Sequence, residues 1–149
     1  MQQTRGGKYA ECWQNEYCAV QNISLKYVVA SKHGDEYVVV AKYVVAKNIV
    51  GTENVKPNFF TQTIGTEVKK HIDVGTLCAI NFIIKGGETP VVFDGIGQDT
   101  YTVALLNVNE NHSVPTQKGE DRLLFKLRFT SNKYNEVKQS IQDYLQKEE

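Results

Sequence analysis

Three histidines are the side chains of this sequence best suited to acid-base chemistry or metal binding at neutral pH: His33, His71 and His112. A catalytic histidine needs a nucleophile or a carboxylate within reach, and a metal-binding histidine needs further ligands. Each of the three falls in a segment expected to be a turn, a helix end or a loop, with no such partner at a recognised spacing. We therefore interpret all three as solvated surface residues.

The three cysteines could ligate a metal or form a disulfide, but their spacing favours neither. Cys12 and Cys18 lack the tight Cys-x-x-Cys spacing of structural zinc sites, although His33 could approach them in space. An odd and small number of cysteines suits a reducing compartment, and pairing of Cys12 with Cys18 stays open. Cys78 lies within a strand pattern, which predicts a buried and inert thiol.

The glycine clusters and the carboxylates do not have the spacing of a phosphate-binding loop or of a catalytic pair. A phosphate-binding loop leads into the N-terminus of a helix, whereas strands are expected after Gly86-Gly87 and after residues 95–97. Glu110 and the pair Glu120-Asp121 fall in an expected loop without the spacing of a catalytic pair. The sequence thus predicts no catalytic residues, no cofactor and no metal site, and we expect a protein that is not an enzyme.

The composition predicts one globular domain with no net charge that would attract a charged partner. The chain has 149 residues, 41% of them hydrophobic, which is enough to bury a core without disulfides. Its 17 basic and 17 acidic residues balance, so no net field attracts nucleic acid or an anionic membrane. Residues 1–8 are polar, and no apolar run approaches the roughly 20 residues that span a bilayer. We expect a cytoplasmic or otherwise intracellular protein without membrane contact, with a secreted mature fragment as the alternative.

A β-hairpin is predicted in the first third of the chain. Residues 23–30 alternate between the two faces of a strand, and residues 31–35 predict a turn. Residues 36–49 are rich in β-branched and aromatic types, which favour a strand. Because this second strand exceeds the usual length of about 5 to 6 residues and is apolar on both faces, we expect it to bend and to be covered on both sides.

Shorter elements are predicted in the middle of the chain. Residues 51–60 predict a loop that carries the aromatic pair Phe59-Phe60, and apolar residues at every fourth position predict a short helix over 64–72. The remaining expectations are strands over 77–84, 90–93 and 100–106, a turn over 94–97, and a mobile polar loop over 107–121.

The C-terminal part changes its period from two to 3.6. Residues 123–129 alternate in a way that predicts a strand with one apolar and one largely charged, solvated face. Residues 132–146 predict an amphipathic helix that packs one stripe on the sheet. The stripe consists of Tyr134, Val137, Ile141, Tyr144 and Leu145.

Together these elements predict a mainly β (α+β) fold. We expect a small curved antiparallel sheet or a partly open barrel, with a short internal helix and a C-terminal amphipathic helix. The domain should cover residues 17–147 and follow a flexible segment over 1–16. In its order of elements the chain resembles two families, the pleckstrin-homology-like (PH-like) domains and the small oligonucleotide-binding (OB) folds, and this likeness of architecture implies no site residue.

The expected function is that of a binding module. A strand with two apolar faces, exposed aromatic residues and zero net charge suit an interaction subunit of a larger assembly, bound to a protein partner or to a second copy of the chain. Binding of single-stranded nucleic acid by an OB-like surface is one alternative, and carriage of a small apolar ligand is another. The candidate surface residues are Lys26, Tyr37, Lys42, Tyr43, Phe59, Phe60, Lys126 and Arg128.

Overall fold

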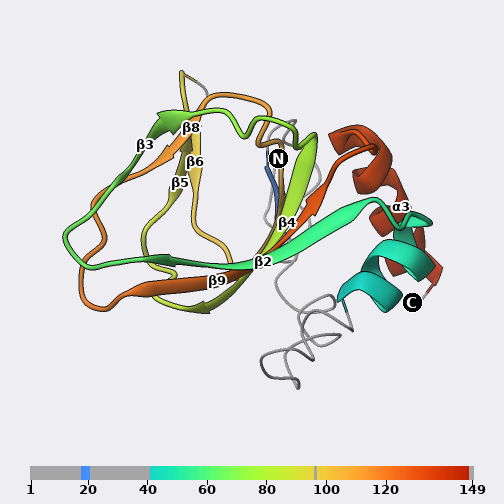
Figure 1. The fold of residues 1–149 in the computed structure, drawn as a ribbon, viewed down its shortest axis with the longest axis horizontal. Helices are drawn as coiled ribbons and strands as arrows, with labels where there is room; N and C mark the ends of the chain where they lie inside the picture. The colour runs from blue at the N-terminus through green and yellow to red at the C-terminus, as the bar shows by residue number, and fades with distance from the viewer. Residues whose placement is uncertain (1–17, 21–40, 96, 148–149) are drawn as a thin grey trace.

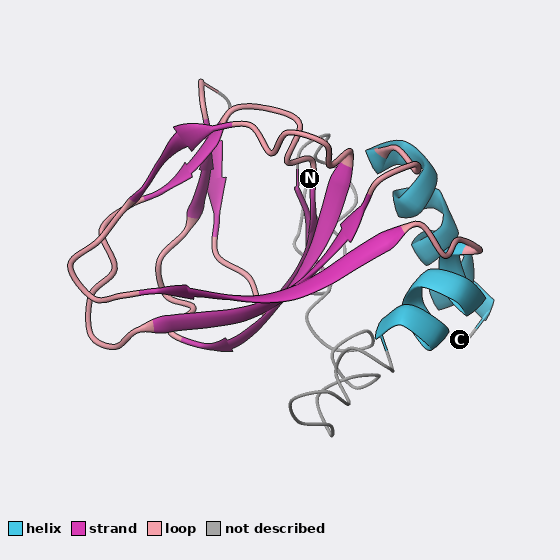
Figure 2. Cartoon of the chain, viewed as in Figure 1, coloured by secondary structure: helices cyan, strands magenta, loops and turns pink. Residues whose placement is uncertain are grey.

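The computed structural model describes residues 18–20, 41–95 and 97–147, which form two antiparallel sheets and two helices (Figures 1 and 2). The predicted mainly β composition and the C-terminal helix are therefore confirmed. The segment 1–16 and the first strand of the predicted hairpin, 23–30, lie outside the described residues. Among the described residues, no helix is long and apolar enough to cross a membrane.

The strands are divided between a five-stranded and a four-stranded sheet. The larger sheet contains, in spatial order, β1 (Cys18–Val20), β7 (Val103–Leu106), β4 (Cys78–Lys85), β9 (Arg122–Phe129) and β2 (Val55–Gln62). The smaller sheet contains β3 (Val68–His71), β8 (His112–Val114), β5 (Val91–Phe93) and β6 (Gly97–Asp99).

The path of the chain between these sheets defines the architecture. From β2 onward the chain crosses repeatedly from one sheet to the other, and non-consecutive strands become neighbours. Two antiparallel sheets wound in this way form a jelly roll, whereas an OB fold is a five-stranded barrel. The expected single curved sheet or partly open barrel, OB-like or PH-like, is thus replaced by two facing sheets.

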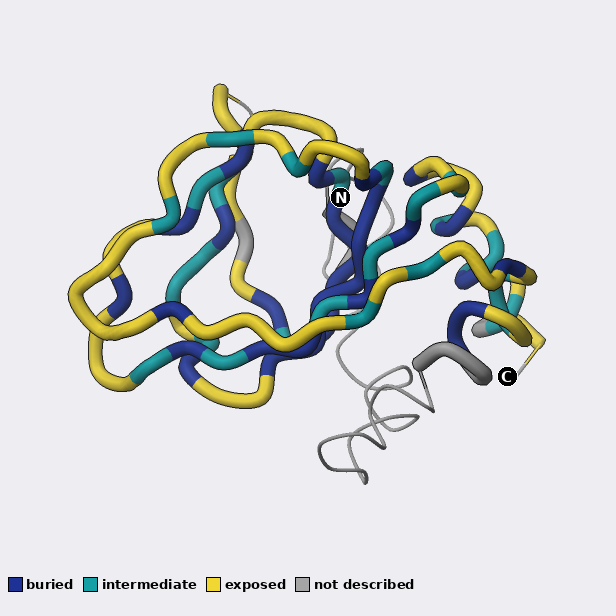
Figure 3. Tube along the Cα trace, viewed as in Figure 1, coloured by how far each residue is buried: buried dark blue, intermediate teal, exposed yellow. Residues whose placement is uncertain are grey.

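The central strands β7, β4 and β9 of the larger sheet are largely buried (Figure 3), and their side chains belong to two cores, one on each face. Successive residues of a strand point to opposite faces, so Ile80 and Phe82 of β4 lie on one side, and Ala79 and Ile83 on the other. The first pair belongs to a core that the helices cover, together with Phe125, Leu127 and Phe129 of β9. The second pair belongs to a core between the sheets, which Val91, Phe93, Leu106 and Leu124 complete.

Helix α3 (Tyr134–Lys147) covers the outer face of the larger sheet, as predicted. Tyr134, Val137 and Ile141 are buried in the core beneath it. Its first turn is closed by Glu136, whose Oε1 accepts a hydrogen bond of 2.7 Å from the backbone N–H of Lys133. The apolar stripe therefore has a structural role in covering the sheet.

The prediction of a strand was wrong for residues 41–49, because Ala41–Val50 form the π-helix η2. Val45 and Ala46 are fully buried in the core beneath the helices, and Ile49 and Val50 pack against the same core. This spacing places all four on one side of a helix. A short run of buried β-branched residues gives the same pattern in a strand and in a buried helix, so the sequence could not separate the two.

Two further predictions were wrong between residues 51 and 72. The expected loop over 51–60 contains most of β2, an edge strand, and an edge tolerates Pro57 because its missing N–H would have faced solvent. The expected helix over 64–72 is a turn followed by β3, with Gly65 at a φ of 85°. Ile64 and Ile72 are exposed, so their spacing does not mark a buried helical face.

The remaining strand predictions were confirmed, and the structure adds two short strands, β6 and β8, that were not predicted. Strands β4, β5 and β9 occupy the expected segments, and the strand expected over 100–106 is shortened to β7. The expected turn over 94–97 leads into β6, and the expected loop over 107–121 contains β8. This last error matters most, because β8 carries His112.

Candidate metal centre

Strands β3 and β8 bring two distant histidines together. They pair antiparallel with His71 opposite His112, and the two imidazole rings lie 4.3 Å apart between centroids. Asp73 follows His71 by two residues, a separation that returns an extended chain to the same side. Its Oδ1 lies 3.1 Å from Nε2 of His71 and 3.3 Å from Nε2 of His112. Three potential ligand atoms from two neighbouring segments therefore converge.

The hydrogen bonds of both imidazoles leave Nε2 available. Nδ1 of His71 lies 2.6 Å from the carbonyl oxygen of Lys69, and Nδ1 of His112 lies 2.8 Å from that of Glu110. A carbonyl can only accept a hydrogen bond, so each Nδ1 carries a proton, and Nε2 is the ring nitrogen that faces Oδ1 of Asp73. Backbone bonds of this kind fix the tautomer and orientation of metal-binding histidines.

The three atoms fit a single transition-metal ion. They all lie within 4.8 Å of one another. Two ligand atoms at right angles, each about 2.1 Å from an ion, would be about 3.0 Å apart, close to the separations found around Oδ1. Two histidines and one carboxylate on one face of an ion, with the other positions open, are the ligand set of non-haem iron(II) oxygenases. The donor set therefore fits iron(II) or a similar divalent ion.

Asp73 is ionised in these surroundings. Burial alone would raise the pKa of this carboxyl group, but a hydrogen bond from His112 and the charges of Lys126, His112 and His71 outweigh it and lower the pKa to about 2. Its side chain is 13% exposed. A carboxylate is consequently present over the whole physiological pH range.

Lys126 of β9 approaches the other oxygen of the same carboxylate. Its Nζ lies 3.5 Å from Oδ2 of Asp73 and 5.8 Å from the centre of the Phe60 ring. Burial lowers the pKa of this ammonium and the neighbouring Arg122 and Arg128 add to that effect, while Asp73 opposes it. Lys126 therefore lies inside the fold, on the charged face of β9 that the sequence predicted to be solvated.

A cavity of about 90 Å³ between the sheets joins this cluster to a second polar group. His71, His112 and Lys126 line one part of it, and Arg122 lies within the same cavity. The guanidinium is almost fully buried and donates hydrogen bonds to Gln62 Oε1 at 3.3 Å and to the Tyr101 hydroxyl at 2.9 Å. Asn81 donates a further bond to the same hydroxyl at 3.0 Å.

The surroundings of Arg122 suit an anionic ligand. Within the described part of the chain, no carboxylate lies at ion-pair distance from this guanidinium, and its Nε and the Oδ1 of Asn81 are buried without hydrogen-bond partners. A buried cation held only by neutral groups is costly, and a carboxylate that enters the cavity would relieve that cost.

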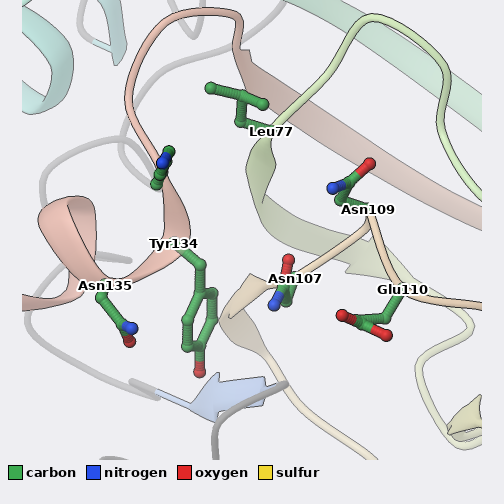
Figure 4. A pocket seen from close by; sticks show the side chains of 7 residues that line it. Leu77, Asn107, Asn109, Glu110, Tyr134 and Asn135 are labelled. Carbon is green, nitrogen blue, oxygen red and sulfur yellow. The ribbon is translucent and has the colours of Figure 1, made fainter.

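A larger hollow of about 350 Å³ lies on the other side of the turn 107–110 (Figure 4). Figure 4 shows the side chains of Asn107, Asn109 and Glu110 facing Tyr134 and Asn135 at the start of α3. Val108, between them in sequence, lines the smaller cavity instead. Among the described residues, the one three-residue group suited to a metal lies at the smaller cavity, which is therefore the better candidate site.

Half of the residues proposed from the sequence as a partner surface are described with their side chains, and these lie on the paired strands β2 and β9. Lys26 and Tyr37 lie outside the described residues, and Lys42 and Tyr43 belong to η2, where their side chains are not described. Phe59 and Phe60 of β2 are 41% and 37% exposed. Arg128 donates a hydrogen bond of 3.4 Å to the Thr76 hydroxyl, and Lys126 contacts Asp73. A role of these residues in binding a protein partner stays a prediction.

The interpretation of the histidines as solvated was wrong for His112, which is 5% exposed. The sequence did carry a signal for this cluster. His71 and Asp73 are two residues apart, so they share a side if the segment is extended and diverge if it is helical. The helix predicted over 64–72 concealed this relation. His33 lies outside the described residues.

The expected non-enzymatic protein-interaction module is also wrong. The interior of the fold holds a small polar cavity in which three potential metal ligands and the buried Arg122 meet. Two cations of β9, Arg122 and Lys126, line this cavity.

Comparisons with known proteins do not assign the chain to a family. No protein-family model matches the sequence, and no curated protein matches it. The structure is similar to an RmlC-like cupin from Desulfovibrio desulfuricans, with 21% identity over 53% of this chain and 74% of the cupin at a TM-score of 0.42. It is also similar to an oxidoreductase of the 2OG-Fe(II) oxygenase family from Burkholderia pseudomallei, with 12% identity over 65% of this chain and 58% of the other at 0.46. A prolyl-4-hydroxylase from Pseudomonas putida gives 14% identity over 72% of this chain and 65% of the other at a TM-score of 0.43. The chain thus spans less than two thirds of the length of this oxidoreductase and of this prolyl-4-hydroxylase.

Proposed function

We propose that this chain is a metal-dependent oxygenase that binds iron(II) through Nε2 of His71, Oδ1 of Asp73 and Nε2 of His112. The observation that carries the proposal is the convergence of these three atoms, with both Nδ1–H groups bound to backbone carbonyls. That arrangement presents two imidazole nitrogens and one carboxylate oxygen to the same point, and an ion that binds there would displace any proton on Nε2.

A small 2-oxo acid with a second carboxylate is the co-substrate that suits the cavity. Arg122 offers a buried guanidinium to the distal carboxylate, and Tyr101 and Gln62 hold the guanidinium in place. The cavity of about 90 Å³ limits the co-substrate to a short acid. The reaction would convert a 2-oxo acid, O₂ and a C–H group into the shortened carboxylic acid, CO₂ and an alcohol, which balances all atoms.

Different residues of this chain would bind the metal, bind the 2-oxo acid and exclude water. Bound iron(II) would supply the site at which O₂ and the 2-oxo acid react. The imidazoles of His71 and His112, fixed by their backbone bonds, keep the ligand atoms in position before the ion arrives. Arg122 binds and orients the acid, and the apolar side chains Leu106, Val108 and Leu124 of the cavity exclude water.

Metal binding can be tested on the full chain with manganese(II), a redox-stable substitute for iron(II), by electron paramagnetic resonance. We expect one manganese(II) per chain, and at least a tenfold loss of affinity in Asp73→Ala or His112→Ala because each removes a ligand. Asp94→Ala is the matched control, since this exposed carboxylate contacts Lys70 rather than the cluster. Equal binding by all four proteins would refute the proposal.

The reaction can be tested separately from metal binding. The iron(II)-loaded protein should consume O₂ and release CO₂ from 2-oxoglutarate slowly even when no further substrate is added. Arg122→Met should bind manganese(II) normally and lose this turnover. A wild-type protein that binds the metal but neither binds nor decarboxylates any short 2-oxo acid would restrict the site to metal binding and contradict the oxygenase.

A further inference from the structure

Lys126 is not explained by the ligand set or by the anion site, and its position is unusual for a lysine. Lysine side chains are almost always exposed unless they are paired, but this one is 18% exposed within the cavity between the sheets. It lies four residues after Arg122 on the same face of β9. Burial of an ammonium is costly, so a specific contact is needed to balance it.

The two oxygens of Asp73 are used in different ways. Oδ1 faces the Nε2 atoms of both histidines, at 3.1 Å and 3.3 Å. Oδ2 faces Nζ of Lys126 at 3.5 Å. The carboxylate therefore has its plane fixed by groups on opposite sides, with one oxygen at the ligand cluster and the other held by the lysine.

We propose that Lys126 is a positioning residue that holds Oδ2 of Asp73, so that only Oδ1 is available to the metal. This inference rests on the proposed function. A carboxylate can bind an ion through one oxygen or through both, and the second mode would occupy a further coordination position. By holding Oδ2, the ammonium keeps that position open for exchangeable ligands.

Arg128 provides a matched comparison for this role. It lies two residues after Lys126 on the same face of β9 and also carries a positive charge. Its guanidinium contacts the Thr76 hydroxyl at 3.4 Å, and Asp73 is not among the partners found for it within the described residues. Arg128→Met therefore removes a nearby charge without releasing Oδ2, which separates positioning from a general electrostatic effect.

The test measures the number of exchangeable waters on manganese(II) bound to the full chain, by proton relaxation. An octahedral ion held by three protein atoms carries about three waters, and one held by four carries about two. We expect the wild type and Arg128→Met to show the higher number. Lys126→Met should lose about one water, and Lys126→Arg should restore it, because a cation again faces Oδ2.

The alternative outcomes distinguish failure of the positioning role of Lys126 from failure of the proposed function. Loss of manganese(II) in Asp73→Ala together with an unchanged water number in Lys126→Met would refute the positioning role and leave the metal site intact. An equal loss of water in Arg128→Met, or no restoration by Lys126→Arg, would also refute it. Retention of manganese(II) by Asp73→Ala would refute the proposed function itself. If Lys126→Met does not fold, as judged by circular dichroism, Lys126→Leu, which also has no hydrogen-bond donor, replaces it with the same expectation.

Discussion

Nε2 of His112 lies 3.3 Å from Oδ1 of Asp73, and this contact joins β8 to the segment that follows β3. The pair ties protonation of one carboxyl group to the stability of the smaller sheet. The pKa of Asp73 is lowered from 3.8 to about 2, because the hydrogen bond from His112 and the nearby positive charges outweigh its burial.

The metal-free protein should therefore lose stability in acid through Asp73. A carboxyl group with a lowered pKa in the folded state stabilises it fully above pH 3.8, and this contribution disappears as the pH falls through about 2. The shift corresponds to roughly 2 kcal/mol. Urea denaturation in the presence of a chelator should show Asp73→Asn less stable by about this amount at pH 6 and nearly equal to the wild type at pH 2. Asp94→Asn, an exposed control, should follow the wild type at both values.

Metal binding should raise the thermal stability of the chain. A ligand that binds only the folded state at 100 times its dissociation constant adds about 2.7 kcal/mol to the free energy of unfolding. We expect manganese(II) to raise the melting temperature and a chelator to reverse the rise. His112→Ala should melt at the same temperature with and without the metal. A similar rise in that variant would place the binding site elsewhere.

Arg122 should control the affinity for the co-substrate and not that for the metal. A hydrogen bond to a charged group contributes about 1.5 to 3 kcal/mol, so its loss should weaken 2-oxoglutarate binding by roughly 10- to 100-fold. Calorimetric titration of the manganese(II)-loaded Arg122→Met measures this. Equal affinity in the variant and the wild type would show that the acid, if bound, lies elsewhere.

Ile141 should be important for folding and irrelevant to the site. Its side chain is fully buried beneath α3, in the core on the far side of the larger sheet from the cavity. Ile141→Ala should cost about 2 to 5 kcal/mol in urea denaturation, because it removes buried methyl groups and leaves a void. Gln146→Ala, on the exposed side of the helix, should cost almost nothing. Manganese(II) affinity of the folded Ile141→Ala protein should equal that of the wild type.

Cys78 should resist alkylation in the native protein. Burial raises the pKa of this thiol to about 12, and the nearby Glu136 adds to the rise. At pH 8 the reactive thiolate is then about one part in ten thousand. Peptide mapping after iodoacetamide treatment should find Cys78 unmodified in buffer and modified in urea. Rapid modification in buffer would mean that the core beneath α3 opens readily.

The sequence predicted the elements whose faces differ in polarity and the buried strand β4, and failed at the apolar run of η2 and where polar residues lie inside. The alternation of β9 and the stripe of α3 were recognised because each has one apolar side. Helix η2 was mistaken for a strand because Val45, Ala46, Ile49 and Val50 form a continuous apolar run. No local pattern separates a buried helix from a buried strand in such a run.

The candidate site was missed for a related reason. Lys126 was expected on a solvated face of its strand, but together with Arg122 it faces a cavity that exists only once the smaller sheet folds over the larger one. Likewise, His112 lies in a polar segment that predicts a loop, and only its pairing with β3 brings it to His71. The pairing of strands determines which distant residues become neighbours, and the local periodicity of the sequence does not reveal that pairing.

The two faces of β9 also determine which changes of length the chain can accept. Phe125, Leu127 and Phe129 fill the core beneath the helices, while the intervening Lys126 and Arg128 lie on the opposite face of the strand. One residue inserted into the middle of this strand would exchange the two sets beyond the insertion, placing cations under α3 and aromatic rings in the cavity. Natural insertions and deletions should therefore accumulate in the turns, such as that around Gly119, and be absent from β9, so that the length of this strand is inherited unchanged while its loops vary.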